Sequence, residues 1–230
     1  MLFVCTWLWG DKWNPVYAER LFAGLYRNIE QRFRSVLITD SGATAGADIV
    51  YPLGPEHHML LQTPGCLARM ELFDRDLQAQ IGASVGDRIV NIDVDAVITG
   101  QLDPLFDRDA EFTIMQGYNQ TNPCPFNGSL WMFRAGERHD VWEDFSLDAF
   151  ERYNVPIHSI PDDQGWLHYK FPKADAYTTA DGVYAFKKIG WKKGRRKLPL
   201  DARLVAFPGR DPAKYLECDW IRQHWLGETC

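Results

Sequence analysis

Two aspartates stand one residue apart at the end of an apolar run, in the segment RIVNIDVDAVITGQLDPLF (88–106). In an extended chain, side chains at positions i and i+2 point the same way, with Cα atoms about 6–7 Å apart. Asp93 and Asp95 would then direct two carboxylates at one point, where they repel each other and resist desolvation. A divalent cation removes both penalties, and oxygen-only ligation suits Mg²⁺ or Mn²⁺, which also bind water and substrate phosphates. The pair therefore predicts a metal that holds a diphosphate.

Two other interpretations of the pair are open. A bare D-x-D sequence is often no more than two solvated loop residues. An apolar strand followed by D-x-D is also how haloacid-dehalogenase-type phosphatases present a nucleophilic aspartate and its acid/base partner. There the motif normally follows the first strand, whereas Asp93 comes after some ninety residues. Because the pair ends a buried strand inside an α/β pattern, the metal interpretation is favoured over both.

Strands and helices alternate along the rest of the chain. This order predicts one α/β domain over residues 1–230, Rossmann-like, with a mostly parallel central sheet and helices on both faces. Ligands of such sheets collect at the carboxyl ends of the strands, so the loops 54–65 and 117–128 are the expected active-site loops. Apolar runs predict strands at 2–8, 35–39, 48–53, 88–92, 111–115, 129–133 and 203–207, and apolar residues at 3–4 spacing predict helices behind Asn14-Pro15, at 67–77 and at 141–150.

Composition narrows the class of protein. Of 230 residues, 46% are hydrophobic, which is ample for a packed core, and the net charge of −6 argues against non-specific nucleic-acid binding by the whole surface. Five scattered cysteines without a C-x-x-C pair are typical of neither a disulfide framework nor a zinc site. No run approaches the ~20 apolar residues of a membrane-spanning helix. The sequence predicts a cytoplasmic protein without a transmembrane segment, and it leaves the oligomeric state open.

Four further segments, with the aspartate pair, resemble glycosyltransferase family 8, whose members have the GT-A fold. NIDVDAVITGQLDPLF resembles the family's strand, D-x-D motif and following turn. The chain is most similar to short bacterial and phage-encoded proteins of this type, which places it in a bacterial cell or a phage-infected host. The other segments, in chain order, are ARMELF (68–73), PFNGSLWMFRAG (125–136), DDQGWLHY (162–169) and ARLVAFPGRDPAKY (202–215).

The resemblance implies transfer of a hexose or pentose from a nucleotide-sugar donor, first of all a UDP-sugar, with retention at the anomeric carbon. It implies Mn²⁺ or Mg²⁺ at Asp93 and Asp95, and it assigns support of the reacting sugar to Asp163 and Gln164. The acceptor stays open among a glycan, a lipid-linked glycan, a protein and a nucleic acid. The donor-binding residues implied by the resemblance are Cys5, Thr6, Trp7, Arg69, Asp93, Asn127, Gly128, Gly209 and Lys214.

One position departs from the family pattern. Where the late segment of the family supplies a histidine as third metal ligand, this chain has Ala206. Hard cations accept water in place of a protein ligand, so metal binding by two carboxylates and the donor remains feasible. The substitution also prompts the alternative of a nucleotide-sugar-binding protein without catalysis.

A basic segment and a pair of adjacent histidines could each be functional or could simply be exposed loop residues. The segment FKKIGWKKGRRK (186–197) contains seven basic residues, which favours a solvated loop over an anionic-acceptor site. His57 and His58 are adjacent, so their side chains would point to opposite faces and would not chelate one metal. The histidines are expected to be an exposed loop pair.

Overall fold

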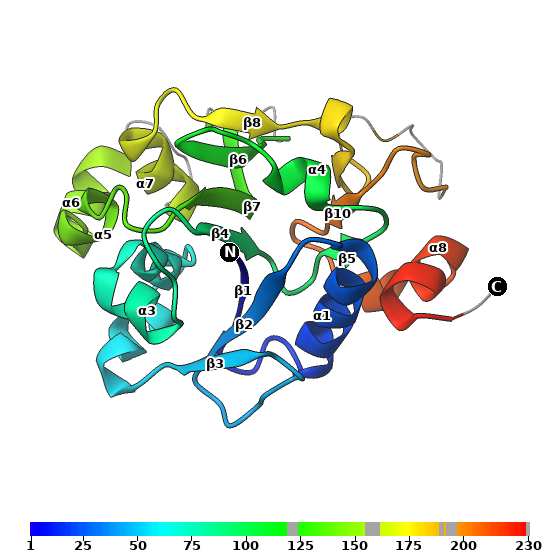
Figure 1. Ribbon diagram of the computed structural model, residues 1–230, viewed down its shortest axis with the longest axis horizontal. Coiled ribbons are helices and arrows are strands. Elements are labelled where there is room, and N and C mark those ends of the chain that lie inside the picture. The colour runs from blue at the N-terminus through cyan, green and yellow to red at the C-terminus, as the bar shows by residue number, and fades with distance from the viewer. Residues whose placement is uncertain (119–123, 155–161, 189–190, 192–196, 229–230) are drawn as a thin grey trace.

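The computed structural model describes residues 1–118, 124–154, 162–188, 191 and 197–228. Its central sheet has the strand order β3-β2-β1-β4-β7-β6-β8 (Figure 1). Strand β7 runs antiparallel to both of its neighbours, and every other neighbouring pair is parallel. The mostly parallel sheet predicted from the sequence is thereby confirmed. The strands are β1 (Leu2–Leu8), β2 (Phe33–Thr39), β3 (Ile49–Pro52), β4 (Arg88–Ile92), β6 (Phe112–Gln116), β7 (Phe126–Arg134) and β8 (Asp175–Tyr177).

Alternating side chains of the strands build one apolar core on each face of the sheet. In β1, Phe3, Cys5 and Trp7 belong to one core, and Leu2 and Val4 belong to the other. Helices cover both faces, as predicted (Figure 1). On one face lie α1 (Val16–Asn28) and α4 (Asp103–Phe106), and on the other lie α3 (Arg75–Gln80), α5 (Asp140–Glu143), α6 (Leu147–Asn154) and α7 (Asp163–Lys170).

Two of the predicted helices are each divided in the structure. The region 67–77 forms a 3₁₀ helix, η2 (Leu67–Phe73), followed by α3. Asp74 separates them, because its backbone is extended and its side chain accepts a hydrogen bond from the Asp76 amide as an N-cap. The region 141–150 likewise divides into α5 and α6, and the Ser146 hydroxyl accepts a hydrogen bond from the Ala149 amide in the first turn of α6. Apolar spacing located these segments correctly but missed the capping residues that interrupt them.

A second, three-stranded sheet contains β5, β10 and β9. The apolar run 203–207 therefore forms a strand, but in this small sheet rather than in the central one. The chain after it packs against α1, where the Arg27 guanidinium donates to the His224 carbonyl at 2.7 Å. Within the described residues, no helix is both long enough and apolar enough to cross a membrane. The remaining elements are β5 (Val97–Ile98), β9 (Val183–Ala185), β10 (Leu204–Ala206), α2 (His58–Gln62), α8 (Asp219–Ile221), the 3₁₀ helices η1 (Pro55–His57), η3 (Thr179–Asp181) and η4 (Pro212–Tyr215), and the π-helix η5 (Arg222–Leu226).

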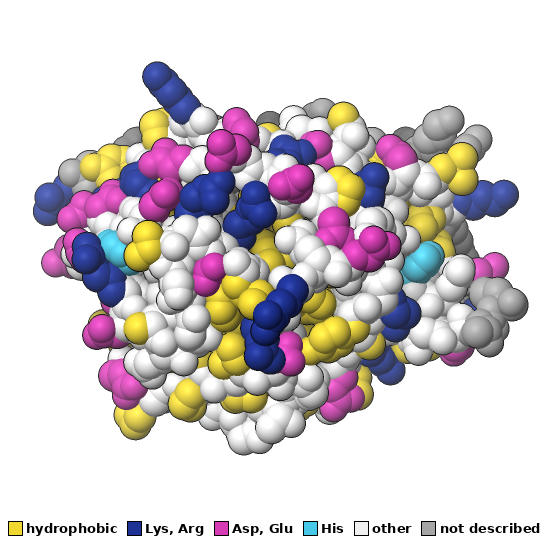
Figure 2. Space-filling view, viewed as in Figure 1, with side chains coloured by type: hydrophobic (Ala, Val, Ile, Leu, Met, Phe, Trp, Pro, Cys, Tyr) yellow, Lys and Arg dark blue, Asp and Glu magenta, His cyan; other side chains and the backbone are white. Residues whose placement is uncertain are grey.

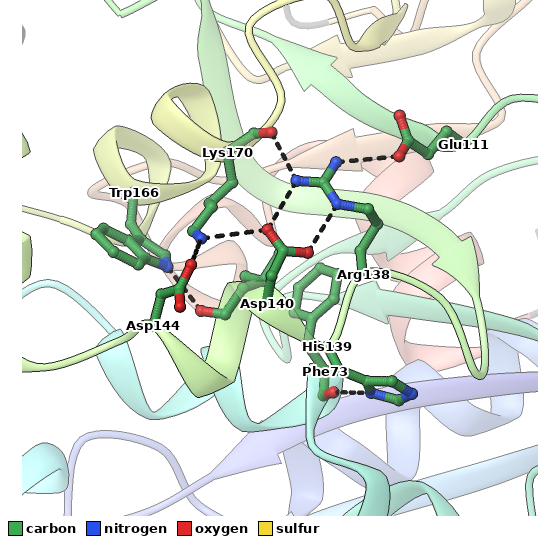
Figure 3. Close-up of polar contacts among 9 residues, drawn as sticks. Phe73, Glu111, Arg138, His139, Asp140, Asp144, Trp166 and Lys170 are labelled. Carbon is green, nitrogen blue, oxygen red and sulfur yellow. Dashed lines mark hydrogen bonds and ion pairs between the residues drawn. The ribbon is translucent and has the colours of Figure 1, made fainter.

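A network of ion pairs fixes α7 against α5 (Figure 3). The Arg138 guanidinium donates to both carboxylate oxygens of Asp140, at 2.8 and 3.1 Å, and to the Lys170 carbonyl at 2.9 Å. Lys170 in turn donates to Asp140 and Asp144. The indole of Trp166, a residue 1% exposed, donates to the Val141 carbonyl at 2.8 Å. Because these contacts hold Trp166 and Lys170 of this short helix, they also fix the direction of its first turn.

Gly182, between η3 and β9, is a position where a side chain should be strongly destabilising. Its φ is +78°, and a Cβ atom would lie 2.3 Å from the Asp201 carbonyl oxygen. We expect Gly182→Ala to lower the free energy of unfolding by about 2–4 kcal/mol, as the sum of left-handed strain and overpacking. Gly82, with a φ of +80° and no atom within 4 Å of the added Cβ, is the matched control and should lose about 1 kcal/mol. Urea denaturation measures both, and equal losses would contradict the clash.

Candidate active site

A cavity of about 330 Å³ opens at the edge of the central sheet where β1, β4 and β6 end and β7 begins. The parallel strands contribute their carboxyl ends, and antiparallel β7 contributes its beginning. The wall therefore collects residues from segments far apart in the chain. They are Trp7, Trp9, Lys12, Trp13, Gly65, Cys66, Arg69, Asp93, Val94, Asp95, Tyr118, Asn127, Gly128, Ser129, Asp162, Asp163, Gln164, Pro208 and Gly209.

Most of the residues implied by the resemblance lie in this wall, and three do not. Cys5 and Thr6 are fully buried behind it, and the Thr6 hydroxyl donates to the Ile92 carbonyl at 2.8 Å. Lys214 is exposed on η4 and is not among the described lining residues. The members that the structure does bring together are Trp7, Arg69, Asp93, Asp95, Asn127, Gly128, Asp163, Gln164 and Gly209.

Asp93 and Asp95 follow β4 in a tight turn. The Asp93 amide donates to the Ser129 carbonyl at 2.9 Å, and the Asp93 carbonyl accepts from the Ala96 amide at 3.0 Å. The segment is thus a turn rather than the extended chain assumed from the sequence. Both side chains nevertheless line the same cavity.

Arg69, on η2, lies between two of the wall's carboxylates. Its guanidinium forms ion pairs with Asp93 and, at 3.2 Å, with Asp163, and it also donates to the Gly128 carbonyl at 3.3 Å. Its side chain is 11% exposed and that of Asp163 is 4% exposed. Burial alone would lower the pKa of Arg69, but the neighbouring negative charges outweigh it and raise the pKa further above its ordinary value. Arg69 is therefore a permanent positive charge inside the cavity wall.

The first turn of α7 presents a carboxylate and an amide to the cavity. Burial raises the pKa of Asp163 to about 7, despite the opposing charge of Arg69. Asp162 caps the helix and accepts a hydrogen bond from the Gln164 side-chain amide at 2.7 Å. Burial raises the pKa of Asp162 to about 6. The side chain of Gln164 is therefore held in place by its own neighbour.

The wall has more acidic than basic side chains. Asp93, Asp95, Asp162 and Asp163 face two cations, Lys12 and Arg69. Burial, together with the charge of Asp93, raises the pKa of Asp95 to about 8. A cation bound at these carboxylates would keep them ionised and would add positive charge for an anionic ligand such as a diphosphate.

Two carboxylates in one wall fit a hard divalent cation, which prefers oxygen ligands and retains water. One oxygen of Asp93 bonds Arg69, which leaves its other oxygen and Asp95 as ligands. Ala206 is fully buried in β10 and contributes nothing to the wall. In the described part of the chain, no group of three or more His, Cys, Asp or Glu side chains is placed to hold a metal. A cation would therefore need the donor or water for its remaining ligands.

Sequence reasoning missed several lining residues. Trp9, Lys12 and Trp13 follow β1, and Tyr118 follows β6. Tyr118 falls in the loop 117–128 that was predicted to border the site, of which residues 119–123 lie outside the described residues. For Trp9, Lys12 and Trp13 the available signal was their position directly after the first predicted strand, since loops at strand ends border such sites.

The expectation for the two histidines is half wrong. His58 is exposed, as predicted, but it is the first residue of α2 rather than a loop residue, and its side chain bonds that of Gln62. His57 is 6% exposed, and its Nε2 lies 2.8 Å from the Glu71 carboxylate. The partner is 14 positions away, so the Pro-flanked local sequence gave no sign of it.

Comparison with known proteins shows the fold. No family model matches the chain, and no curated protein matches it in sequence. The solved structures that resemble it include the galactosyltransferase LgtC in complex with donor and acceptor sugar analogs, with a TM-score of 0.67 and 12% identity over 99% of this chain and 96% of that one. An active-site mutant of LgtC gives a TM-score of 0.62 and 11% identity over 91% and 89%. The chain thus has the GT-A fold of LgtC, as the sequence motifs predicted.

Asp163 should make stability depend on pH in the ligand-free protein. Its folded-state pKa of about 7 lies above the ordinary 3.8, so between these values the folded protein holds a proton that the unfolded chain has lost. Its stabilising contribution is complete below about pH 4 and is lost as pH rises to 7. The free energy of unfolding should therefore fall between pH 5 and 8 in the wild type. In Asp163→Asn, which lacks this titratable group, we expect that fall to be smaller by about 2–3 kcal/mol.

Urea titrations in the presence of a chelator measure this decline. Exposed Asp148, in the first turn of α6, is the control, and Asp148→Asn should keep the wild-type slope. A decline as steep in Asp163→Asn as in the wild type would show that Asp163 ionises normally.

Proposed function

We propose that the chain is a glycosyltransferase that moves a sugar from a nucleotide-sugar donor, a UDP-sugar first of all, to an acceptor hydroxyl with retention of anomeric configuration. The transferred sugar is a hexose or a pentose, and residues 1–230 act as one GT-A domain. The single observation that carries the proposal is the cavity at the carboxyl edge of this GT-A sheet, where Asp93, Asp95 and Arg69 meet Asp163 and Gln164. The solved structure of LgtC with donor and acceptor sugar analogs supports it through the shared fold.

We assign the donor's diphosphate to the side of the cavity formed by Asp93, Asp95 and Lys12. Mn²⁺ or Mg²⁺ held by the two carboxylates would supply positive charge to the leaving diphosphate. The chain adds the charges of Lys12 and Arg69, because both side chains line the same cavity. Cys5 and Thr6 support this wall from behind rather than contact the donor.

We assign the transferred sugar to the opposite side, between Gly128 and the first turn of α7. A Cβ atom at position 128 would lie 3.0 Å from the Asp163 carboxylate oxygens, so glycine lets that carboxylate pack close to the β7 backbone. Arg69 orients Asp163, and Asp162 orients the Gln164 amide. Asp163 and Gln164 can then accept and donate hydrogen bonds to the sugar and support positive charge as its anomeric bond breaks.

Two other functions would use the same cavity, and the structure weighs differently on each. A non-catalytic nucleotide-sugar binder is favoured by one observation: with alanine at position 206, the described residues offer no third protein ligand for a metal. A phosphohydrolase with Asp93 as nucleophile is disfavoured, because that carboxylate is ion-paired with Arg69 and the fold is that of LgtC. A donor of this class and the free thiols of Cys5 and Cys66 suit the reducing cytoplasm that we propose as its location.

The proposal is tested with nucleotide sugars. We expect a UDP-sugar with Mn²⁺ or Mg²⁺ to raise the melting temperature, and chelation to remove that shift. Asp95→Asn should lower donor turnover by roughly 100-fold or more, since charge stabilisation at the leaving group is lost. Retention is read from the anomeric configuration of the product by NMR.

Asp148→Asn is the matched control, because it makes the same change at an exposed site on α6. Unchanged turnover and metal dependence in Asp95→Asn would refute the metal role. Saturable donor binding without turnover over a broad acceptor panel would select the non-catalytic binder. No binding by UDP-, GDP- or other nucleotide sugars would refute both.

A further inference from the structure

Three cationic side chains lie beside the mouth of the cavity. The Lys188 ammonium is 5.3 Å from the ring centre of Tyr118, a residue of the cavity wall. Arg210 directly follows Gly209 of the wall, and its guanidinium donates to the Tyr215 hydroxyl at 3.3 Å. The Lys187 ammonium is 4.3 Å from the ring centre of Tyr215. We call Lys187, Lys188 and Arg210 the basic rim.

The rim is adjacent to the acidic cavity through Tyr118. Burial and the charges of Asp93, Asp162 and Asp95 raise the pKa of Tyr118 to about 12, and the charge of Arg210 opposes that rise. The ring of Tyr118 thus lies within reach of both the cavity's carboxylates and the rim. A molecule that contacts Tyr118 can therefore contact the carboxylates of the cavity and the cations of the rim at the same time.

The charges of the rim lack acidic partners. Within the described residues, no carboxylate forms an ion pair with Lys187, Lys188 or Arg210. Other basic side chains do have such partners: Arg108 and Arg134 each pair with an aspartate, and basic side chains lie beside acidic ones on the face shown in Figure 2. The two lysines lie over aromatic rings instead, and Arg210 donates to the Tyr215 hydroxyl, so these contacts hold the cations in place without neutralising them.

Lys187 also has an unusual backbone, with a φ of 57°. Few residues other than glycine adopt this left-handed conformation, because it brings the Cβ atom close to the following carbonyl oxygen. A side chain retained despite this close approach is a candidate for a binding role.

We propose, on the basis of the proposed function, that the acceptor carries a phosphate group, which binds to Lys187, Lys188 and Arg210 while the acceptor hydroxyl enters the cavity at Tyr118. The carboxylates inside the cavity repel an acceptor's negative charge, whereas the unpaired rim attracts it. The donor's diphosphate is assigned to the cavity's own cations, which leaves the rim to a second anion. Three cations suit one phosphate or diphosphate, whereas nucleic-acid strands commonly engage about 6–10 phosphate contacts.

The test fills the donor site first. The full chain is saturated with UDP and Mg²⁺, and inorganic phosphate is titrated while amide NMR spectra are recorded. We expect saturable shifts at Tyr118, Lys187 and Lys188, and a dissociation constant at least roughly fivefold weaker in Lys188→Glu. Lys173→Glu is the matched control. Lys173 is exposed just before β8, at the amino ends of the parallel strands, whereas Tyr118 follows the carboxyl end of β6. The Lys173→Glu variant should therefore bind phosphate as the wild type does.

Lys187→Glu serves as a second variant should Lys188→Glu fail to fold. No shift at the rim, or equal phosphate affinity in both rim variants and the wild type, would overturn the proposal. Failure of every nucleotide and nucleotide sugar to bind, UDP and GDP included, would instead refute the proposed function, and the phosphate response would still be read at the rim amides.

Two further probes distinguish a soluble phosphorylated acceptor from a lipid one. Competition by glucose 1-phosphate, without binding to phosphatidylglycerol vesicles, places the phosphate on a soluble acceptor. Lys188-dependent sedimentation with those vesicles places it on a lipid. Tight, salt-dependent binding of a single-stranded oligonucleotide without any response to phosphate would overturn the proposal in favour of a nucleic-acid acceptor.

Discussion

The buried contacts of Arg69 join segments that are far apart in the sequence. Its guanidinium meets Asp93 after β4, Asp163 at the start of α7 and the Gly128 carbonyl in β7. Removing one partner from a buried ion pair typically costs about 3–5 kcal/mol, because the remaining charge is left without compensation. The same contacts restrict the neighbouring sequence, since Gly128 has no room for a side chain beside the Asp163 carboxylate. The stability of the wall and the arrangement of its chemistry therefore depend on one side chain.

The topology of the sheet determines which residues reach Arg69. In a wholly parallel sheet, each strand would contribute its last residues to this edge. Antiparallel β7 instead contributes its first residues, so Asn127, Gly128 and Ser129 face the turn after β4. The hydrogen bond from the Asp93 amide to the Ser129 carbonyl fixes that turn. On the far side, the ion pairs of Arg138 and Lys170 fix α7, which carries Asp163 and Gln164 (Figure 3).

Local sequence pattern predicted those features that local physics determines. Apolar runs located six of the seven strands of the central sheet and missed the short edge strand β8, and the D-x-D pair located one wall of the cavity. The same reasoning placed the strand at 203–207 without showing that it belongs to a second sheet, because strand pairing is a long-range choice. It also missed the burial of His57, which depends on Glu71, and the exclusion of Lys214 from the cavity wall. Each of these errors involves a contact between distant segments, which periodicity does not encode.

The distribution of charge connects the structure to the chemistry proposed for it. A cavity with four carboxylates and two cations is a poor site for a diphosphate alone, and it becomes a good one when a divalent cation is added. Because Arg69 is already shared between Asp93 and Asp163, it cannot replace that cation at Asp95. Ala206 adds no ligand, so the cation would depend on the donor for part of its coordination. Binding of metal and donor would then be mutually dependent: each supplies the charge or the ligands that the other lacks in this cavity.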